Sequence, residues 1–264
     1  MKIAFFGGTF DPVHRGHIQI ASSVVERFDV GQVLFVPASI QPLKQDQQTT
    51  AYHHRFAMLT LATQERREFV VSDLEAPKEG STPNYSLNTI RELKRRLRKA
   101  DKLYLLLGID AFLGIAKWHK PAALLRECEF IIASRPGFSM GQVAAALPEE
   151  LRPRKDILNI AHKQKLDFSR DPVQTIALPG ITLHLMGDMS EKVSATQIRA
   201  AAKSAGKARL RSLVGEAVAE YIQKTGIYRR ATQNASAVKS ERAKAEVIEL
   251  SKHSRRVRSS KANR

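Results

Sequence analysis

Short apolar runs alternate with amphipathic stretches along the first 230 residues. Apolar runs typical of buried strands cover residues 2–6, 33–36, 69–71, 103–107, 130–133 and 181–186. Between them, apolar positions recur at helical spacing over about 16–28, 52–66, 86–99, 194–203 and 213–225. Strands that are apolar on both faces and alternate with helices predict an α/β fold with a doubly wound parallel sheet. In such a sheet, ligands bind beyond the carboxyl ends of the strands.

Two segments depart from this alternation. Residues 138–180 contain several prolines, mixed charge and no clear period, which predicts a partly helical insertion. Residues 231–264 are rich in Ala, Ser, Lys and Arg and poor in large apolar side chains, so we expect a basic, disordered tail with a short helix within 241–250. The pattern therefore predicts one domain over residues 1–230, followed by the tail.

The composition indicates the cellular compartment of the chain and the charge of its partners. The chain has 264 residues and a formal net charge of +17, which favours anionic partners such as nucleotides, nucleic acid or acidic membranes. No apolar run is long enough to span a bilayer. The single cysteine, Cys128, excludes an intrachain disulfide and is consistent with a cytoplasmic location.

The first predicted strand leads into a glycine turn with two histidines, Gly7-Gly8-Thr9-Phe10-Asp11-Pro12-Val13-His14-Arg15-Gly16-His17. Glycines let backbone N–H groups approach a ligand closely, and the helix start that follows adds free amides and a positive dipole end. His14 and His17 are three residues apart, so they can share one face of the helix. The stretch predicts a phosphate site, although its spacing matches neither the P-loop nor G-x-G-x-x-G.

A second phosphate-binding pattern lies near the C-terminal end of the predicted domain. Ser194 and Thr196 stand at a predicted helix start, where hydroxyls cap free amides and bind phosphate oxygens. Arg199, one turn later, can add a forked cationic contact. Taken alone, an ordinary serine N-cap followed by a surface arginine is the better explanation of this segment.

Together these motifs resemble the nucleotidylyltransferase signature, in which T-F-D-P leads into H-x-G-H. Over about residues 1–230 the chain is most similar to the bacterial nicotinate-nucleotide adenylyltransferase family. Further matches are residues 193–199 with I-S-S-T-x-I-R, Gly108, Asp110 and Trp118 with G-x-D followed by W, residues 84–89 with S-Y-T-x-D-T, and residues 37–44 with P-x-x-x-P-P-H-K. The chain departs from these patterns at Gln41, Leu43, Ser86, Asn88 and Ala195.

The resemblance implies a Rossmann-like fold with a C-terminal helical part, and adenylyl transfer from ATP to nicotinate mononucleotide that yields deamido-NAD and pyrophosphate. It implies that His14 and His17 are catalytic and steady the α-phosphoryl group. The ATP contacts that it implies are Gly8, Thr9, Phe10, His17, Gly108, Asp110, Arg135, Ser194, Thr196 and Arg199. The acceptor contacts that it implies are Lys44, Tyr85, Ser86 and Trp118. Arg55 matches a basic position of the family, with either a phosphate-binding or a structural ion-pair role.

Mg²⁺ is expected to accompany ATP with little protein ligation, so we name no metal ligand. A zinc site is disfavoured because Cys128 is alone and no H-E-x-x-H motif occurs.

Three alternatives stay open at this point. Nicotinamide mononucleotide could be the acceptor instead of nicotinate mononucleotide, and the sequence does not decide between them. Phosphopantetheine is a further candidate acceptor, against which His14 and Trp118 argue. A nucleic-acid-binding protein is the alternative from another class, but the basic tail lacks aromatic residues and suits only non-specific electrostatic contact. The oligomeric state is also open, and a homo-oligomer is compatible with the sequence.

Overall fold

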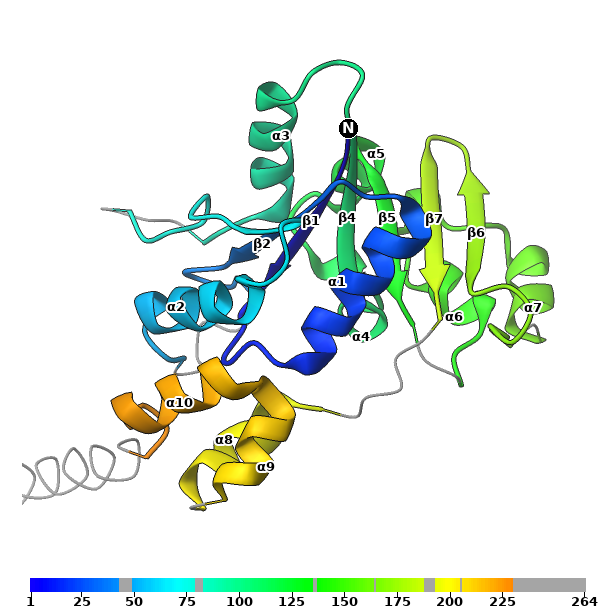
Figure 1. Cartoon of the computed structure of the whole chain (residues 1–264). Helices are drawn as coiled ribbons and strands as arrows, with labels where there is room; N and C mark the ends of the chain where they lie inside the picture. Colours follow the sequence, from blue (N-terminus) through cyan, green and yellow to red (C-terminus); the bar gives the residue numbers. More distant parts are fainter. Residues whose placement is uncertain are drawn as a thin grey trace, which may run out of the picture.

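The computed structural model describes residues 1–42, 49–78, 83–134, 137–163, 165–187, 193–204 and 206–229. A seven-stranded sheet, in the order β3-β2-β1-β4-β5-β7-β6, forms its centre (Figure 1). All neighbouring strands are parallel except β6, which pairs antiparallel with β7. The strands are β1 (Lys2–Gly8), β2 (Gln32–Pro37), β3 (Phe69–Val71), β4 (Lys102–Gly108), β5 (Glu129–Ala133), β6 (Val173–Leu178) and β7 (Ile181–Met186).

Helices cover both faces of the sheet, because successive side chains of a strand point to opposite faces. Ala4 and Phe6 of β1 belong to one core, with α1 (Arg15–Phe28), α2 (Tyr52–Thr63), α8 (Ala195–Lys203), α9 (Lys207–Val214) and α10 (Glu216–Thr225). Ile3 and Phe5 belong to the other, with α3 (Ser86–Arg96), α4 (Ile109–Phe112), η1 (Ile115–Lys117), α5 (Pro121–Glu127) and α6 (Met140–Ala145). This confirms the predicted doubly wound α/β fold.

The segment over residues 138–180 is more regular than predicted. It contains α6, η2 (Glu149–Leu151), α7 (Lys155–Lys163) and the edge strand β6. The prediction missed β6, which forms a hairpin with β7 through Pro179-Gly180, from Leu178 to Ile181. A two-residue turn between two apolar runs is a hairpin signal.

The helix predicted over 213–225 is α10, which ends at Thr225 but begins only at Glu216. The helix before it, α9, was not predicted, and Gly215 between the two has a φ of +86°. That backbone conformation is strained for residues with a side chain, so a glycine here separates the helices. The helices predicted over 52–66 and 86–99 also end early, at Thr63 and Arg96.

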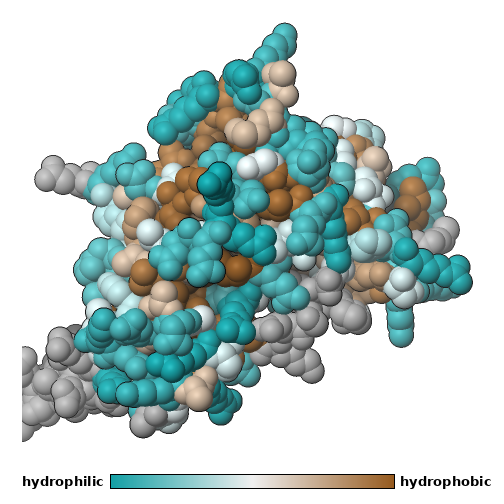
Figure 2. Space-filling view, in the orientation of Figure 1, coloured by the Kyte–Doolittle hydropathy of each residue, from teal (hydrophilic) through white to brown (hydrophobic). Residues whose placement is uncertain are grey.

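The surface of the C-terminal helices is polar where these helices face away from the core. In the space-filling view, the outer surfaces of the C-terminal helices are largely hydrophilic, and apolar residues show mainly between helices (Figure 2). In the part of the chain that the structure describes, no helix is both long and apolar enough to cross a membrane.

The strand order places a ligand crevice between β1 and β4. These two neighbours are the point at which successive connections depart in opposite directions along the sheet. Open α/β sheets bind ligands at the carboxyl ends of the strands at such a switch point. Gly8 ends β1 and Gly108 ends β4, so both of these predicted ATP-binding glycines lie at this edge of the sheet.

Candidate active site

The two histidines of the glycine turn form a stacked pair at the start of α1. His14 is the N-cap residue and His17 lies in the first turn. Their ring centroids are 3.7 Å apart, with 27° between the ring planes. The backbone N–H of His14 donates to Nδ1 of His17 at 3.2 Å. Because Nδ1 accepts this hydrogen bond, the neutral ring of His17 carries its proton on Nε2, which makes Nε2 a donor.

Both imidazoles are held in the neutral form. Burial lowers the pKa of His14 to about 4. Burial, reinforced by the neighbouring His14, lowers the pKa of His17 well below its ordinary value. Desolvation disfavours the charged form of an imidazole, so at neutral pH each ring is uncharged and has one N–H to donate.

The Nδ1 atom of His14 is buried without a hydrogen-bond partner in the described structure. An unpaired buried polar atom is costly, and such groups are concentrated where a ligand or a catalytic step uses them.

Close packing explains the glycines of the motif. A Cβ atom at Gly16 would lie 3.1 Å from Nδ1 of His14, so this glycine gives the His14 ring room to fold over the helix start. A Cβ atom at Gly8 would lie 3.0 Å from the Phe10 ring, which is buried and packs edge-on against His17 at 5.0 Å. Glycine at these positions therefore lets the aromatic rings support His14 and His17.

Arg55 of α2 anchors the glycine turn through hydrogen bonds to backbone carbonyl oxygens. It is 1% exposed, the largest fully buried side chain in the described chain. Its Nη1 donates to the carbonyl oxygen of Thr9 at 2.6 Å, and its Nε donates to the carbonyl oxygen of Thr50 at 2.8 Å. Burial lowers the pKa of Arg55, and the nearby Asp11 carboxylate opposes that shift. These contacts favour the structural role, through hydrogen bonds to backbone carbonyl oxygens.

The start of α8 lies against the same turn. Nη1 of Arg199 donates to the carbonyl oxygen of Asp11 at 2.8 Å, and its Nη2 donates to Oγ1 of Thr196 at 3.3 Å. Ser194 caps the helix by accepting from the N–H of Gln197 at 3.3 Å. Through Arg199, the start of α8 with Ser194 and Thr196 is thus joined to the His14 and His17 turn from more than 170 positions away in the chain.

Of the predicted acceptor residues, the structure describes Tyr85, Ser86 and Trp118. Tyr85 precedes α3 and Ser86 begins it. The ring of Tyr85 stacks on His119 with centroids 4.3 Å apart, which places Tyr85 beside the chain at Trp118. Trp118 itself is half-buried and packs against the core that includes side chains of α3 and α5.

Asn84 ties this acceptor region to the segment after β2. Its Oδ1 accepts from the N–H and Oγ of Ser39, at 3.1 and 2.8 Å, and from the N–H of Ile40 at 3.0 Å. The resemblance did not assign a role to Asn84, and an amide oxygen that accepts three donors from a distant loop has no local sequence signal.

Other predicted contacts lie at the strand ends. Asp110 is exposed in the first turn of α4, directly after Gly108. A side chain at Gly108 would meet nothing within 4 Å, so its own packing does not require a glycine. Lys44 and Arg135 lie outside the described residues, as does the tail over 231–264.

The described residues do not offer a metal site of their own. They include no group of three or more His, Cys, Asp or Glu side chains placed to hold a metal ion. Asp11, the carboxylate within the turn, already accepts from the N–H of Thr50 at 3.0 Å and from the hydroxyl of Tyr228 at 2.8 Å.

The sequence matches a known protein family and several curated proteins. The model of the cytidylyltransferase-like family matches residues 5–201. A relative from Geobacter metallireducens, described as "Probable nicotinate-nucleotide adenylyltransferase", is 33% identical over 86% of this chain and 98% of its own length. One from Thermoanaerobacter sp. with the same description is 33% identical over 89% of this chain and 97% of its own length.

The fold also matches a solved structure. The nicotinic acid mononucleotide adenylyltransferase of Plasmodium falciparum, complexed with NaAD, superposes with a TM-score of 0.60, covering 86% of this chain and 97% of that chain at 17% identity. The sequence matches assign the family, and the structural match agrees with them in fold. The chain therefore belongs to the cytidylyltransferase-like family and, within it, to the nicotinate-nucleotide adenylyltransferases.

Proposed function

We propose that this chain transfers the adenylyl group of ATP to nicotinate mononucleotide, forming deamido-NAD and releasing pyrophosphate in NAD biosynthesis. Its relatives are described as nicotinate-nucleotide adenylyltransferases over nearly their whole length. The observation that supports the assignment of the site is the stacked His14–His17 pair at the start of α1, in the turn to which Arg199 of α8 is hydrogen-bonded.

A phosphate oxygen of the mononucleotide attacks the α-phosphorus of ATP, and pyrophosphate leaves from the opposite side. The attacking group is already an anion at neutral pH, so the chain needs no strong base. Catalysis then consists of positioning the reactants and stabilising charge as it develops. Neutral histidines suit this role, because they donate hydrogen bonds to the α-phosphoryl oxygens without giving up or taking a proton.

The remaining site residues divide between the two substrates. Backbone amides near Gly8 and Thr9 join His14 and His17 at the α-phosphoryl group, and Ser194, Thr196 and Arg199 bind the leaving pyrophosphate. Phe10 supports the His17 ring, and Asp110 at the end of β4 binds ribose hydroxyls. Arg135 belongs to the loop on the adenine side. On the acceptor side, Trp118 stacks on the pyridine ring, Tyr85 and Ser86 receive the nicotinate carboxylate, and Lys44 binds the mononucleotide phosphate.

Mg²⁺ enters with ATP in this proposal, bound to its phosphates. The two hydrogen bonds that Asp11 already accepts, from Thr50 and Tyr228, support this arrangement in preference to a metal held by the turn. A metal that bridges phosphate oxygens neutralises charge on the leaving group.

An acceptor panel tests the proposal. The full chain with ATP and Mg²⁺ is given nicotinate mononucleotide, nicotinamide mononucleotide or phosphopantetheine, and pyrophosphate release is measured for each. We expect the highest kcat/KM with nicotinate mononucleotide. A higher kcat/KM with either other acceptor would replace the proposed substrate, and no release with any of them would refute adenylyl transfer.

The tail supports one further proposal, non-specific contact with nucleic acid. Residues 231–264 contain nine Lys or Arg and three Glu and no aromatic residue. Such a segment binds polyanions through charge alone, with a strong dependence on salt. Deleting residues 231–264 should reduce retention on RNA at low salt and leave pyrophosphate release unchanged. Loss of activity on deletion would place the tail in the enzyme, and unchanged retention would refute the contact. A homo-oligomer stays a prediction, which sedimentation can test.

A further inference from the structure

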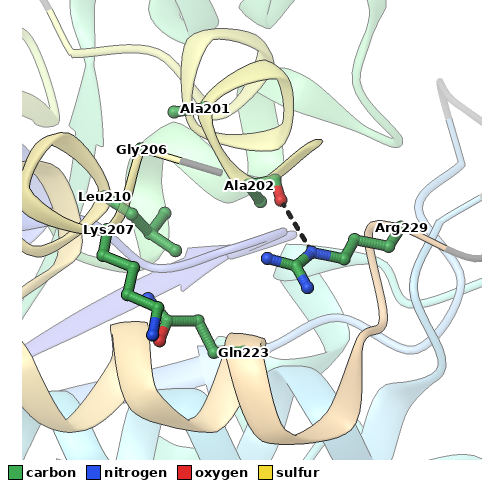
Figure 3. Close-up of a pocket in the computed structure, with 7 residues that line it drawn as sticks. All are labelled: Ala201, Ala202, Gly206, Lys207, Leu210, Gln223 and Arg229. Carbon is green, nitrogen blue, oxygen red and sulfur yellow. Dashed lines mark hydrogen bonds between the residues drawn. The ribbon is translucent and has the colours of Figure 1, made fainter. Parts of the chain in front are cut away.

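The segment that follows α10 returns to the glycine turn. Gly226, at a φ of +63°, ends α10 in the left-handed conformation that favours glycine, and the chain turns back. Tyr228 is then 4% exposed, and its hydroxyl donates to Oδ1 of Asp11 at 2.8 Å across 217 positions of sequence. The next residue, Arg229, donates from Nε to the carbonyl oxygen of Ala202 on α8 at 3.4 Å (Figure 3).

Asp11 connects this closing segment to both halves of the phosphate site. Its Oδ2 accepts from the backbone N–H of Thr50, and its carbonyl oxygen accepts from Arg199 of α8. Asp11 lies three residues before His14 and two after Thr9, within the turn that carries the proposed phosphate-binding amides. Its position therefore sets where the turn, the histidines and the start of α8 stand relative to one another.

We infer that Tyr228 is a positioning residue of the proposed adenylyl-transfer site, acting through Asp11. The hydroxyl fixes the carboxylate, and the carboxylate fixes the turn between β1 and α1. The inference rests on the proposed function of that site. A misplacement of about 1 Å in a catalytic group can cost about 100-fold in rate, so a hydroxyl that contacts no substrate can still control turnover.

The surroundings of Tyr228 keep it suited to this task. Burial, together with the Asp11 carboxylate, raises the pKa of the phenol, so it remains a donor throughout the neutral range. The Asp11 carboxylate makes the bond charge-assisted, and such bonds are about twice as strong as neutral ones.

A matched pair of hydroxyl deletions tests the inference. Tyr228→Phe removes the hydroxyl from Asp11 and keeps the ring in the core. Tyr221→Phe is the control, because Tyr221 lies on α10 and its hydroxyl pairs with Nδ1 of His54 at 2.8 Å instead of with Asp11. We expect kcat to fall at least tenfold in Tyr228→Phe with each KM within twofold of wild type. In Tyr221→Phe, kcat should stay within twofold.

A double-mutant cycle separates positioning from general stability. Asp11→Asn weakens the acceptor, so its effect on kcat and that of Tyr228→Phe should overlap instead of multiplying. Multiplying effects would overturn the route through Asp11. A lower melting temperature with unchanged kcat in Tyr228→Phe would overturn the positioning role altogether.

Two further outcomes keep the test decisive. Should Tyr228→Phe fail to fold, Asp11→Asn alone carries the test, and an unchanged kcat in that variant would overturn the inference. The wild-type chain is assayed alongside with ATP and nicotinate mononucleotide. Inactive wild type refutes the proposed function, on which the inference rests, whereas active wild type with fully active Tyr228→Phe refutes the positioning role only.

Discussion

Replacing His17 with asparagine removes one hydrogen-bond donor from the site and leaves the helix start intact. In the neutral ring, Nδ1 accepts from the N–H of His14 at 3.2 Å and Nε2 carries the proton. The Oδ1 atom of asparagine stands two bonds from Cβ, as Nδ1 does, so it can still accept from His14. The variant therefore loses mainly the Nε2 donor that we assign to the α-phosphoryl group.

The magnitude follows from the role of that donor. Removing one preorganised donor from a site of developing negative charge lowers kcat by about 10²–10³-fold, or about 2.7–4 kcal/mol in activation free energy. The loss of stability should be smaller. The ring contacts that His17 makes with His14 and Phe10 are of a kind worth about 0.5–1.5 kcal/mol each beyond their buried area. We therefore expect a folded protein with kcat reduced at least 100-fold.

Steady-state pyrophosphate release with ATP and nicotinate mononucleotide measures the effect. His53→Asn is the matched control, because His53 is exposed on α2 and its ring contacts only His54 among the described aromatic rings, at 4.3 Å. His17→Gln sharpens the test, since its amide nitrogen can reach the position of Nε2, and its kcat should exceed that of His17→Asn. A kcat within threefold of wild type in folded His17→Asn would refute the reasoning.

Three further predictions test the surroundings of the site. Arg55→Met leaves the carbonyl oxygens of Thr9 and Thr50 unpaired, so urea titration should show a loss of about 3 kcal/mol or more in unfolding free energy, and a change below about 1 kcal/mol would contradict the anchoring role. Acidification should destabilise the fold between pH 6.5 and about 4, because the unfolded chain then binds protons on histidines that the folded chain keeps neutral; the pKa of His14 alone accounts for up to about 3 kcal/mol. Stability at pH 7.5 and 4.5 is compared in urea, and an equal pH dependence in a His14→Asn, His17→Asn double variant would count against this source. Trp118→Ala should raise KM for the mononucleotide about tenfold and leave KM for ATP unchanged, whereas an unchanged mononucleotide KM would reject stacking.

The sequence predicts the architecture well because strands buried on both faces carry an unambiguous apolar pattern. Runs such as Leu103 to Leu107 have no other stable place than the centre of a sheet. The edge strand β6 was missed because its alternation is weak, and an edge strand buries little. The break at Gly215 was missed because a single glycine within a helical pattern does not by itself fix a positive φ.

Part of the candidate site could also be predicted from the sequence, and part could not. Local motifs contain His14, His17, Ser194 and Arg199, so the sequence predicts both phosphate-binding segments. Their convergence depends on long-range contacts such as Arg199 to the carbonyl oxygen of Asp11, which have no local signature.

Buried polar residues were the hardest to predict. The sequence does not distinguish a phosphate ligand from a buried anchor at Arg55, because a basic residue at the start of a helix can be either. The hydrogen bonds to Thr9 and Thr50 favour the anchor. The same applies to Asn84 and to Tyr228, whose hydrogen bonds join loops far apart in the sequence.

A labelling experiment tests the central claim, adenylyl transfer from ATP to nicotinate mononucleotide, most directly. The wild-type chain is incubated with nicotinate mononucleotide, Mg²⁺ and ATP labelled at the α-phosphorus, and the labelled products are separated. Adenylyl transfer predicts that the label appears in deamido-NAD and that the released pyrophosphate is unlabelled. Label that stays with ATP or appears only in AMP, with no labelled dinucleotide formed, would contradict the account.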